Sequence, residues 1–254
     1  MSASQKAGHT FLASLGKTRL RPGGVDATRW LFSQPNLTPD SIVLEVACNM
    51  GTTAIELARR YGCKVYAIDM DKNALATARQ NVAAAGLADK ITVMEANATK
   101  LPFGDGAFDI VINEAMLTMY VDKAKTRLTD EYYRVLKPGG YLLTHDIMFT
   151  HESLEASGHT QLENVVKSNV SPMTHSAWKA LFIASGFRSV DTHHGAMSLM
   201  SPVGMVRDEG LPRTAKILFN GLRNRENRTR FMAMFGFFHR NRRDLNYIAC
   251  CSRK

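Results

Sequence analysis

The sequence predicts a doubly wound α/β fold with a mostly parallel, seven-stranded sheet, on three observations. Short and nearly continuous apolar segments recur along the chain, as expected of strands that are buried on both faces. Segments with helical spacing alternate with them, which is the order of a parallel sheet covered by helices. The chain has 254 residues, 45% hydrophobic and 22% charged, which is the size and composition of a globular domain.

The N-terminal and central elements are each expected from a local pattern. Apolar residues around 10–15 and 27–32 predict two helices, joined by a basic, glycine-rich connector at 16–24. Apolar, β-rich segments predict strands at 41–47, 64–69, 90–95, 108–113 and 140–148. Helical spacing predicts helices at 52–61, 71–85 and 123–136, with Asp71 as the cap of the second.

The pattern loosens after residue 149. We expect a helix at 176–185, a strand at 188–193, a mainly helical insertion at about 201–243 and a last strand at 244–251. No internal repeat or convincing linker interrupts the chain. Residues 1–254 are therefore expected to form a single domain.

Cysteine spacing and hydropathy restrict the class of protein further. The four cysteines have no Cys-x-x-Cys or Cys/His spacing, so we expect buried, reduced thiols and no metal site. No apolar run is long enough to span a membrane, and the first residues lack the apolar stretch of a secretory signal. The expected location is cytoplasmic.

The strongest chemical signal is the segment VLEVACNMGT at 43–52. It predicts a buried strand, a tight loop and a helix, and such a loop brings backbone N–H groups close to a ligand at the carboxyl edge of a sheet. The next strand ends in Asp69, 18 residues after Gly51, where a carboxylate can accept hydrogen bonds from ribose hydroxyls. Together these features indicate a nucleoside-containing ligand. A dinucleotide fits less well, because the G-x-G-x-x-G pattern is absent.

On these residues the sequence resembles the class I S-adenosylmethionine-dependent methyltransferases, and in particular their small-molecule branch, which includes enzymes of ubiquinone and menaquinone biosynthesis. Four blocks carry the resemblance, which extends from about residue 40 to residue 251: VLEVACNMGT, VYAIDMD, EANATKLPFGDGAFDIVINEA and RVLKPGGYLL. It implies a Rossmann-like fold and S-adenosyl-L-methionine as the cofactor, with S-adenosyl-L-homocysteine as its product. It also implies methyl transfer to a small organic acceptor by in-line displacement.

Within this reading the chain has three parts. Residues 1–40 form a helical lid, 41–150 the cofactor-binding core, and 151–254 a substrate-side half that contains the insertion at about 201–243. As the resemblance suggests, the lid would fold over the cofactor. Arg19 or Arg21 would then contact the cofactor carboxylate or an acidic substrate, or would lie in a solvated loop.

The resemblance assigns cofactor-binding roles to residues of this sequence. Glu45 would lie near the methionine ammonium group or make an ordering hydrogen bond, Asp69 would bind the ribose hydroxyls, and Asn113 would lie beside the methionine moiety. The residues expected against the adenine are Met70, Asn97 and Ala98. The residues at the family's three glycine-loop positions are Ala47, Asn49 and Gly51.

Two departures from the family pattern bear on this site. Gly51 alone is retained of the three glycines, and Asn49 is the next best residue for a left-handed backbone. Ala47 is expected to have a negative φ. Asn97 replaces the usual Asp, and we expect its side-chain oxygen to accept from the adenine amino group.

The candidate catalytic residues follow the fourth and fifth strands: Glu114, Tyr120, His145 and Asp146. A histidine oriented by a carboxylate can act as a general base, which is needed only if the nucleophile arrives protonated. Strand alternation puts residues 145 and 146 on opposite faces of the sheet. A hydrogen-bonded core residue is the alternative interpretation of His145. Tyr120 could cradle the sulfonium or a cationic substrate.

Residues 207–243 carry ten Lys and Arg against three Asp and Glu, a net charge of +7 out of +9 for the chain. Aromatic and methionine residues are interleaved with these charges. Three interpretations remain open: an amphipathic cap with a solvated basic face, peripheral contact with an anionic membrane surface, or binding of nucleic acid. Nucleic acid is the least favoured, because Asn113-Glu114-Ala115-Met116 stands where amino-methylating nucleic-acid enzymes usually have an N/D-P-P-Y/F motif.

Three functions are therefore carried forward. The first is methyl transfer to a small molecule, and the second is methylation of a nucleic acid by way of the basic segment. The third is a non-catalytic protein that binds S-adenosylmethionine or acts as a scaffold.

Overall fold

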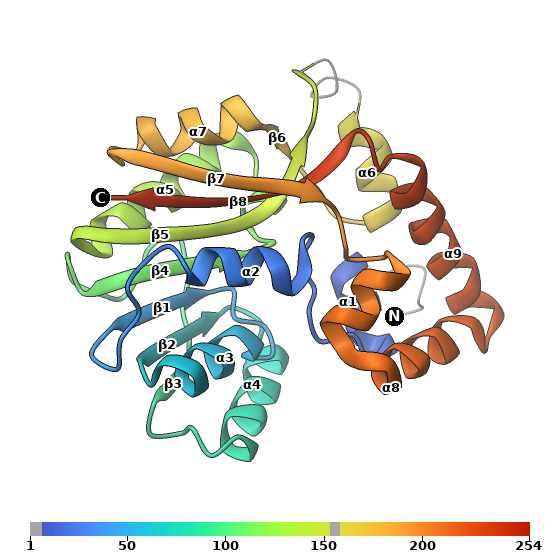
Figure 1. Cartoon of the computed structure of the whole chain (residues 1–254), viewed down its shortest axis with the longest axis horizontal. Helices are drawn as coiled ribbons and strands as arrows, with labels where there is room; N and C mark the ends of the chain where they lie inside the picture. The colour runs from blue at the N-terminus through green and yellow to red at the C-terminus, as the bar shows by residue number, and fades with distance from the viewer. Residues whose placement is uncertain (1–6, 153–157) are drawn as a thin grey trace.

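The computed structural model describes residues 7–152 and 158–254, and its centre is a mixed sheet (Figure 1). The strand order is β3-β2-β1-β4-β5-β8-β7, and the short β6 pairs with β5. The strands are β1 (Ile42–Val46), β2 (Lys64–Asp69), β3 (Ile91–Glu95), β4 (Phe108–Glu114), β5 (Leu136–Phe149), β6 (Met173–Thr174), β7 (Ser189–Ala196) and β8 (Leu245–Arg253). The α/β class and the strand alternation predicted from the sequence are confirmed.

Strand direction places the candidate site. The pairs β1–β2, β2–β3, β1–β4 and β4–β5 are parallel, whereas β8 runs antiparallel to both β5 and β7. The order reverses at β1, which has β2 on one side and β4 on the other. In open α/β sheets, ligands bind outside the carboxyl ends of the strands at such a switch point.

Helices cover both faces of the sheet (Figure 1). The helices are α1 (Gly8–Leu15), α2 (Gly24–Phe32), α3 (Thr52–Tyr61), α4 (Lys72–Ala84), α5 (Asp122–Val135), α6 (Gly158–Val166), α7 (His175–Ala184), α8 (Pro202–Leu222) and α9 (Arg225–Arg240). Helices α2, α3 and α4 pack with Val43, and α5 and α7 pack with its neighbour Leu44. Successive strand residues point to opposite faces, so each face of β1 is buried in a different layer.

Helices α1, α8 and α9 form a third hydrophobic cluster beside the sheet. Phe11 and Leu15 of α1 are buried against Ile217 of α8 and Phe231 and Met234 of α9. The N-terminal helices and the C-terminal insertion, about 200 residues apart in sequence, are therefore packed together. Helix α8 bends at Gly210, whose φ of 76° and ψ of 161° are not helical, two residues before Pro212.

Several local predictions can be compared with the structure. Asp71 caps α4, as predicted, by accepting from the N–H groups of Asn73 and Ala74. All four cysteines are free and buried. Strand β5 begins at Leu136, directly after α5 and earlier than expected, and α6 and β6 were not expected. Within the described ranges, no helix is both long and apolar enough to cross a membrane.

Candidate functional site

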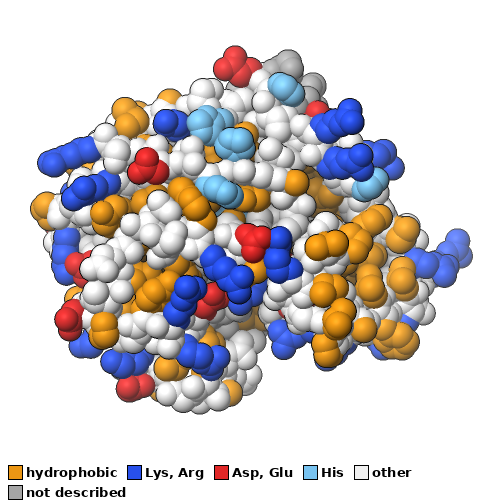
Figure 2. Space-filling model, viewed as in Figure 1, with side chains coloured by type: hydrophobic (Ala, Val, Ile, Leu, Met, Phe, Trp, Pro, Cys, Tyr) orange, Lys and Arg blue, Asp and Glu red, His pale blue; other side chains and the backbone are white. Residues whose placement is uncertain are grey.

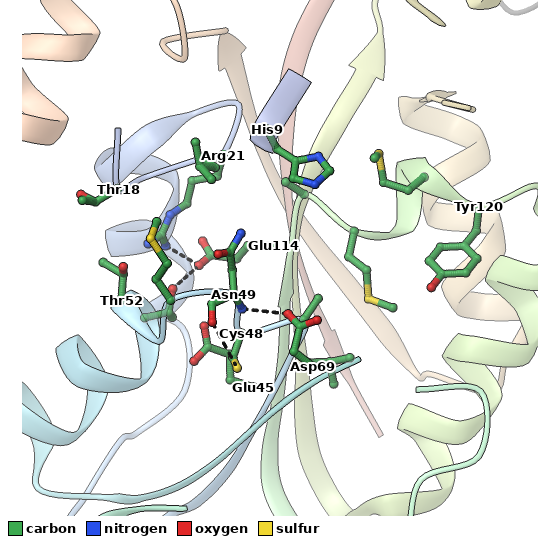
Figure 3. A pocket seen from close by; sticks show the side chains of 18 residues that line it. His9, Thr18, Arg21, Glu45, Cys48, Asn49, Thr52, Asp69, Glu114 and Tyr120 are labelled. Atoms are coloured by element: carbon green, nitrogen blue, oxygen red, sulfur yellow. Dashed lines mark hydrogen bonds and ion pairs between the residues drawn. The ribbon is translucent and has the colours of Figure 1, made fainter. Parts of the chain in front are cut away.

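A cavity of about 260 Å³ lies at the carboxyl ends of β1, β2 and β4, at the switch point of the sheet (Figure 3). Residues of the connector between α1 and α2, among them Thr18 and Arg21, form another part of its wall. Seven residues singled out in the sequence line this first cavity: Arg21, Glu45, Ala47, Asn49, Asp69, Glu114 and Tyr120. The fold therefore brings together residues from four separate segments.

The loop after β1 has an unusual backbone. Ala47, Asn49 and Gly51 all have positive φ, at 57°, 48° and 74°. The expectation of a negative φ at Ala47 was wrong, because the turn needs a left-handed residue at each of the three positions. A left-handed conformation costs a residue with a Cβ about 1–2 kcal/mol. Gly51 is at the N-cap of α3, where its N–H donates to the carbonyl of Cys48 at 2.8 Å.

Asp69 is held rigidly at the end of β2. Its Oδ2 accepts from the N–H of Asn49 at 2.9 Å, and its Oδ1 accepts from the N–H groups of Met70 and Asp71 at 2.7 and 3.0 Å. One carboxylate thus ties the loop after β1 to the turn after β2, beside the cavity. Such a carboxylate keeps acceptor capacity for further donors.

Glu45 is the unsatisfied acid of the site. Its carboxylate is buried, and among the described residues its Oε2 has no hydrogen-bond partner. Burial, and next the nearby charge of Glu114, raise the pKa of Glu45 to about 8, against an opposing effect of Arg21. A buried acceptor without a partner destabilises the folded state, so we expect a cationic or hydrogen-bonding ligand at this oxygen.

Glu114 is a hub that joins the end of β4 to the connector. Its Oε1 accepts from Thr28 at 2.6 Å and lies 3.1 Å from Nδ1 of His145, while its Oε2 accepts from Thr53 at 2.7 Å and pairs with Arg21. Burial alone would raise the pKa of Glu114, but Arg21 and then His145 hold it well below its usual range. The carboxylate is therefore charged and its acceptor sites are occupied.

His145 is fully buried, and both of its ring nitrogens are engaged. The N–H of Gly23 donates to Nε2 at 2.8 Å, so neutral His145 carries its proton on Nδ1 and donates it to Glu114. This geometry does not support the general-base role expected of His145, because no nitrogen lone pair faces the cavity. Asp146, on the opposite side of β5, accepts from the N–H of Thr118 at 3.0 Å instead.

A second clamp holds the same connector to the insertion. Oε1 of Glu209 on α8 accepts from the N–H groups of Thr18 and Arg19, each at 2.9 Å. Its Oε2 accepts from the hydroxyl of Thr18 at 2.7 Å. Arg19 itself pairs with Glu56 of α3 at 2.8 Å and does not line the cavity.

The remaining predicted residues lie outside the first cavity. Asn113 is fully buried within the sheet and donates to Thr144 at 3.3 Å, so Glu114 rather than Asn113 reaches the cavity at the end of β4. Oδ1 of Asn97, expected to accept from adenine, already accepts from both the N–H and the hydroxyl of Thr99. Met70 is 61% exposed and Ala98 is buried.

A second cavity of about 80 Å³ adjoins the first. Four residues line both cavities: His9, Leu20, Ala115 and Met119. The wall of the second cavity is mostly apolar and includes Met234 and Phe238 of α9, with Asp146 as its carboxylate. Burial raises the pKa of Asp146.

His9 and Glu209 are functional candidates that the sequence analysis did not find. Burial lowers the pKa of His9, an effect that Asp69 and Asp71 partly oppose, so His9 is neutral at pH 7. Neither residue belongs to a recognisable sequence motif. Both reach the site because α1 packs against α8. Across the described ranges, no group of three or more His, Cys, Asp or Glu side chains is arranged to hold a metal ion.

The comparisons with known proteins agree with this geometry. The family model described as a methyltransferase domain matches residues 43–140. An uncharacterized protein of Haemophilus influenzae is 52% identical over 99% of this chain and 100% of its own length. The ubiquinone/menaquinone biosynthesis C-methyltransferase of a Marinomonas species is 32% identical over 49% of this chain and 50% of its own length. The chain belongs to the class I S-adenosylmethionine-dependent methyltransferases.

This methyltransferase also shares its fold with solved structures. Phosphoethanolamine N-methyltransferase 2 of Haemonchus contortus, in complex with S-adenosyl-L-methionine, superposes with a TM-score of 0.76 at 17% identity. The superposition covers 97% of this chain and 56% of that chain. At this identity the likeness concerns the fold alone. Named relatives such as the Marinomonas enzyme match over about half of their own length.

Proposed function

We propose that this methyltransferase transfers a methyl group from S-adenosyl-L-methionine to a small, mostly apolar organic acceptor. The observation that carries the proposal is the meeting of two cavities at His9, Leu20 and Met119. The first cavity lies at the switch point and is the more polar of the two, and the second is smaller and mainly apolar. Two adjoining compartments are what a cofactor and an acceptor require if their reacting atoms are to approach.

The polar residues of the first cavity fit the cofactor. We assign the methionine ammonium group to Oε2 of Glu45, because this buried acceptor has no partner among the described residues. The ribose hydroxyls are assigned to Asp69, whose orientation is fixed by three backbone N–H groups. Met70, Asn97 and Ala98 remain the proposed adenine contacts. Because Oδ1 of Asn97 is engaged by Thr99, we assign the contact to its amide nitrogen.

The chain itself then has three tasks. When bound, S-adenosyl-L-methionine supplies an activated, electrophilic methyl group. His9 is neutral and lines both cavities, so it is placed to accept a proton from an acceptor hydroxyl, amine or thiol. Asp146 is placed to hold a donor group of the acceptor. Leu20 and Met119 exclude water from the boundary between the cavities.

The second cavity argues against the two alternative functions, which are nucleic-acid methylation and non-catalytic binding of S-adenosylmethionine. A volume of about 80 Å³ is smaller than the cavity of about 150 Å³ that accepts benzene, so the second cavity fits a small acceptor or the reacting end of a longer one. A nucleotide is a poor fit to it. A non-catalytic protein would have no use for a second cavity that shares four residues with the first.

Calorimetric titration with S-adenosyl-L-methionine tests the cofactor assignment. Asp69→Ala should weaken binding by about 1–3 kcal/mol through lost charged hydrogen bonds. Asp71→Ala is the matched control, because Asp71 caps α4 and accepts only from Asn73 and Ala74. Equal affinities of wild type and Asp69→Ala would remove Asp69 from the site.

Turnover separates the enzyme from a scaffold. The release of S-adenosyl-L-homocysteine should be followed with panels of small aliphatic alcohols, amines, thiols and carboxylic acids. Asp146→Asn should lower turnover and leave cofactor affinity unchanged, whereas Asp191→Asn on exposed β7 should alter neither. Tight cofactor binding without turnover on any acceptor would favour the non-catalytic alternative.

A further inference from the structure

The outer surface of α8 and α9 is unusually apolar. Ten large hydrophobic side chains are exposed among the described residues, and seven of them lie on these two helices. They are Val203, Val206, Leu211, Leu218, Phe219, Leu222 and Met232, and we call the surface they form the α8–α9 face. Leu211 is 70% exposed and Phe219 66%. Figure 2 shows hydrophobic side chains gathered over this part of the molecule. Such a concentration marks an interaction surface.

A groove runs between the two helices on this face. It has a volume of about 320 Å³, and its exposed wall is wholly apolar. Val206, Leu218 and Leu222 of α8 and Met232 of α9 belong both to the groove and to the exposed set. The face therefore offers contiguous apolar surface rather than scattered side chains.

Exposed positive charge is concentrated on the same two helices and the turn after them. Nine basic residues of the two helices and the turn after them are exposed: Arg207, Arg213, Lys216, Arg223, Arg225, Arg228, Arg240, Arg242 and Arg243. The carboxylates of Asp208 and Glu209 are turned inward, beside Lys17. Glu226 is thus the one exposed acidic residue among residues 202–243, all of which are described. Arg207 pairs with Asp26 and Arg213 with Glu209, which leaves seven other exposed cations and one exposed acidic residue on this segment.

The exposed apolar side chains and the exposed cations also form adjoining strips on the two helices. After the bend at Gly210, exposed Leu211, Leu218 and Leu222 follow one side of α8 at helical spacing. On α9, Arg228 precedes Met232 by four residues, which puts both on the same side of that helix. Apolar side chains flanked by cations on helices of this kind are typical of segments that lie in a membrane interface.

We propose that the α8–α9 face docks on an anionic phospholipid surface. The apolar side chains enter the boundary between headgroups and acyl chains, and the arginines and lysine contact lipid phosphates. The lipid is favoured over a nucleic acid because Phe219 is the one exposed aromatic side chain among those seven residues, too few for a base-stacking platform. A purely electrostatic surface would also leave the apolar groove unused.

The position of α9 gives this docking a consequence. Phe238 lines the second cavity and also a separate surface groove that contains Val203 and Arg242. Helix α9 therefore lies between the docked surface and the second cavity. If the proposed function holds, an acceptor with a lipophilic tail reaches its cavity from the membrane past Phe238.

Sedimentation with lipid vesicles tests the docking without requiring any turnover. The full chain should bind vesicles of phosphatidylcholine with about one third phosphatidylglycerol, and binding should fall at least about tenfold on pure phosphatidylcholine or at high salt. Phe219→Asp should reduce binding about tenfold, because it removes an inserted side chain and adds a repelled charge. Ile183→Asp is the matched control, since Ile183 is 51% exposed on α7, outside this face.

A double charge reversal tests the contribution of the exposed arginines on α9. Arg225→Glu with Arg228→Glu should reduce vesicle binding by about tenfold or more, whereas Lys123→Glu with Arg127→Glu on α5 should leave it unchanged. Calorimetry with S-adenosyl-L-methionine should give wild-type affinity for all four variants, which separates this test from that of the proposed function. Equal binding to neutral and anionic vesicles would overturn the proposal. So would single-stranded RNA binding that is insensitive to Phe219→Asp, with no vesicle binding.

Discussion

Gly23 donates its backbone N–H to Nε2 of His145 at 2.8 Å, and the two residues are separated by 122 positions in the sequence. This hydrogen bond attaches the connector between α1 and α2 to the centre of the sheet. Nδ1 of the same ring reaches Glu114, which also binds Arg21 and Thr28. Most polar groups around His145 thus hold one segment over the first cavity.

Removal of the imidazole should loosen the connector. His145→Ala leaves a buried N–H of Gly23 and one oxygen of Glu114 without a partner, so we expect a loss of about 2 kcal/mol or more in unfolding free energy. Trypsin should also cleave faster after Lys17 and Arg19. His194→Ala, at an exposed position of β7, should change the unfolding free energy by less than about 0.5 kcal/mol. Wild-type stability and cleavage in His145→Ala would contradict the positioning role.

Ala47 offers a stabilising substitution. Its φ of 57° is strained for alanine and free for glycine, while glycine has a larger entropy in the unfolded chain. Ala47→Gly should therefore raise the unfolding free energy, measured by urea denaturation, by about 0.5–1 kcal/mol. Ala76→Gly, in the exposed interior of α4, should instead cost about 1 kcal/mol. Similar losses for both variants would show that the loop relaxes when alanine is present.

Glu114 should make stability depend on acidity. Its folded-state pKa lies well below that of an unfolded glutamate, about 4.3, so its contribution is complete above that pH and is lost as the pH falls towards the folded value. Glu114→Gln should cost about 3 kcal/mol at pH 7, because Arg21 remains buried and unpaired. The difference in unfolding free energy between Glu114→Gln and the wild type should be smaller at pH 4 than at pH 7. Glu95→Gln, in an exposed pair with Lys72, should cost at most about 1 kcal/mol at either pH. A gap that does not change with pH would contradict the assigned pKa.

Glu45 should release a proton when the cofactor binds. Its pKa of about 8 means that it is largely protonated at pH 7, and a neighbouring ammonium group would favour the charged form. Calorimetry at pH 7 in buffers of different ionisation enthalpy should therefore report proton release of up to about one per site in the wild type. Glu45→Gln should bind more weakly and release none. The same proton release from both proteins would assign the ammonium group elsewhere.

Protonation of His9 should cause the fall in kcat/KM at low pH, which is the acid limb of the pH–activity profile. Burial lowers its pKa, so the neutral base persists to below pH 6.5 and kcat/KM should fall only as the pH drops through that lowered value. His9→Gln should lower kcat by about 100-fold or more and remove this limb. His194→Gln should keep the wild-type profile. A retained acid limb in His9→Gln would transfer the role of base to another group.

Local sequence patterns were sufficient for the central sheet and for part of the site. The strands around residues 43, 65 and 111 are nearly continuous apolar runs, and such runs are buried on both faces wherever they occur in a parallel sheet. Glu45 and Asp69 lie at the carboxyl ends of β1 and β2, and Asn49 lies three residues after β1, so their convergence at one edge follows from strand direction. The backbone of Ala47 could not be read in this way, because the loop imposes a conformation against the preference of the residue.

Tertiary packing decided what surrounds that edge. His145 looked like a catalytic base in sequence, but Gly23 and Glu114 occupy both of its nitrogens once the connector packs on the sheet. His9 and Glu209 have no motif, and they reach the site because α1 and α8 share a hydrophobic cluster. Sequence alone determined the fold, since this depends on local periodicity and strand ends, and the resemblance of its motifs to a known family indicated the cofactor. The second cavity depends on contacts between segments about 200 residues apart, which no local pattern encodes.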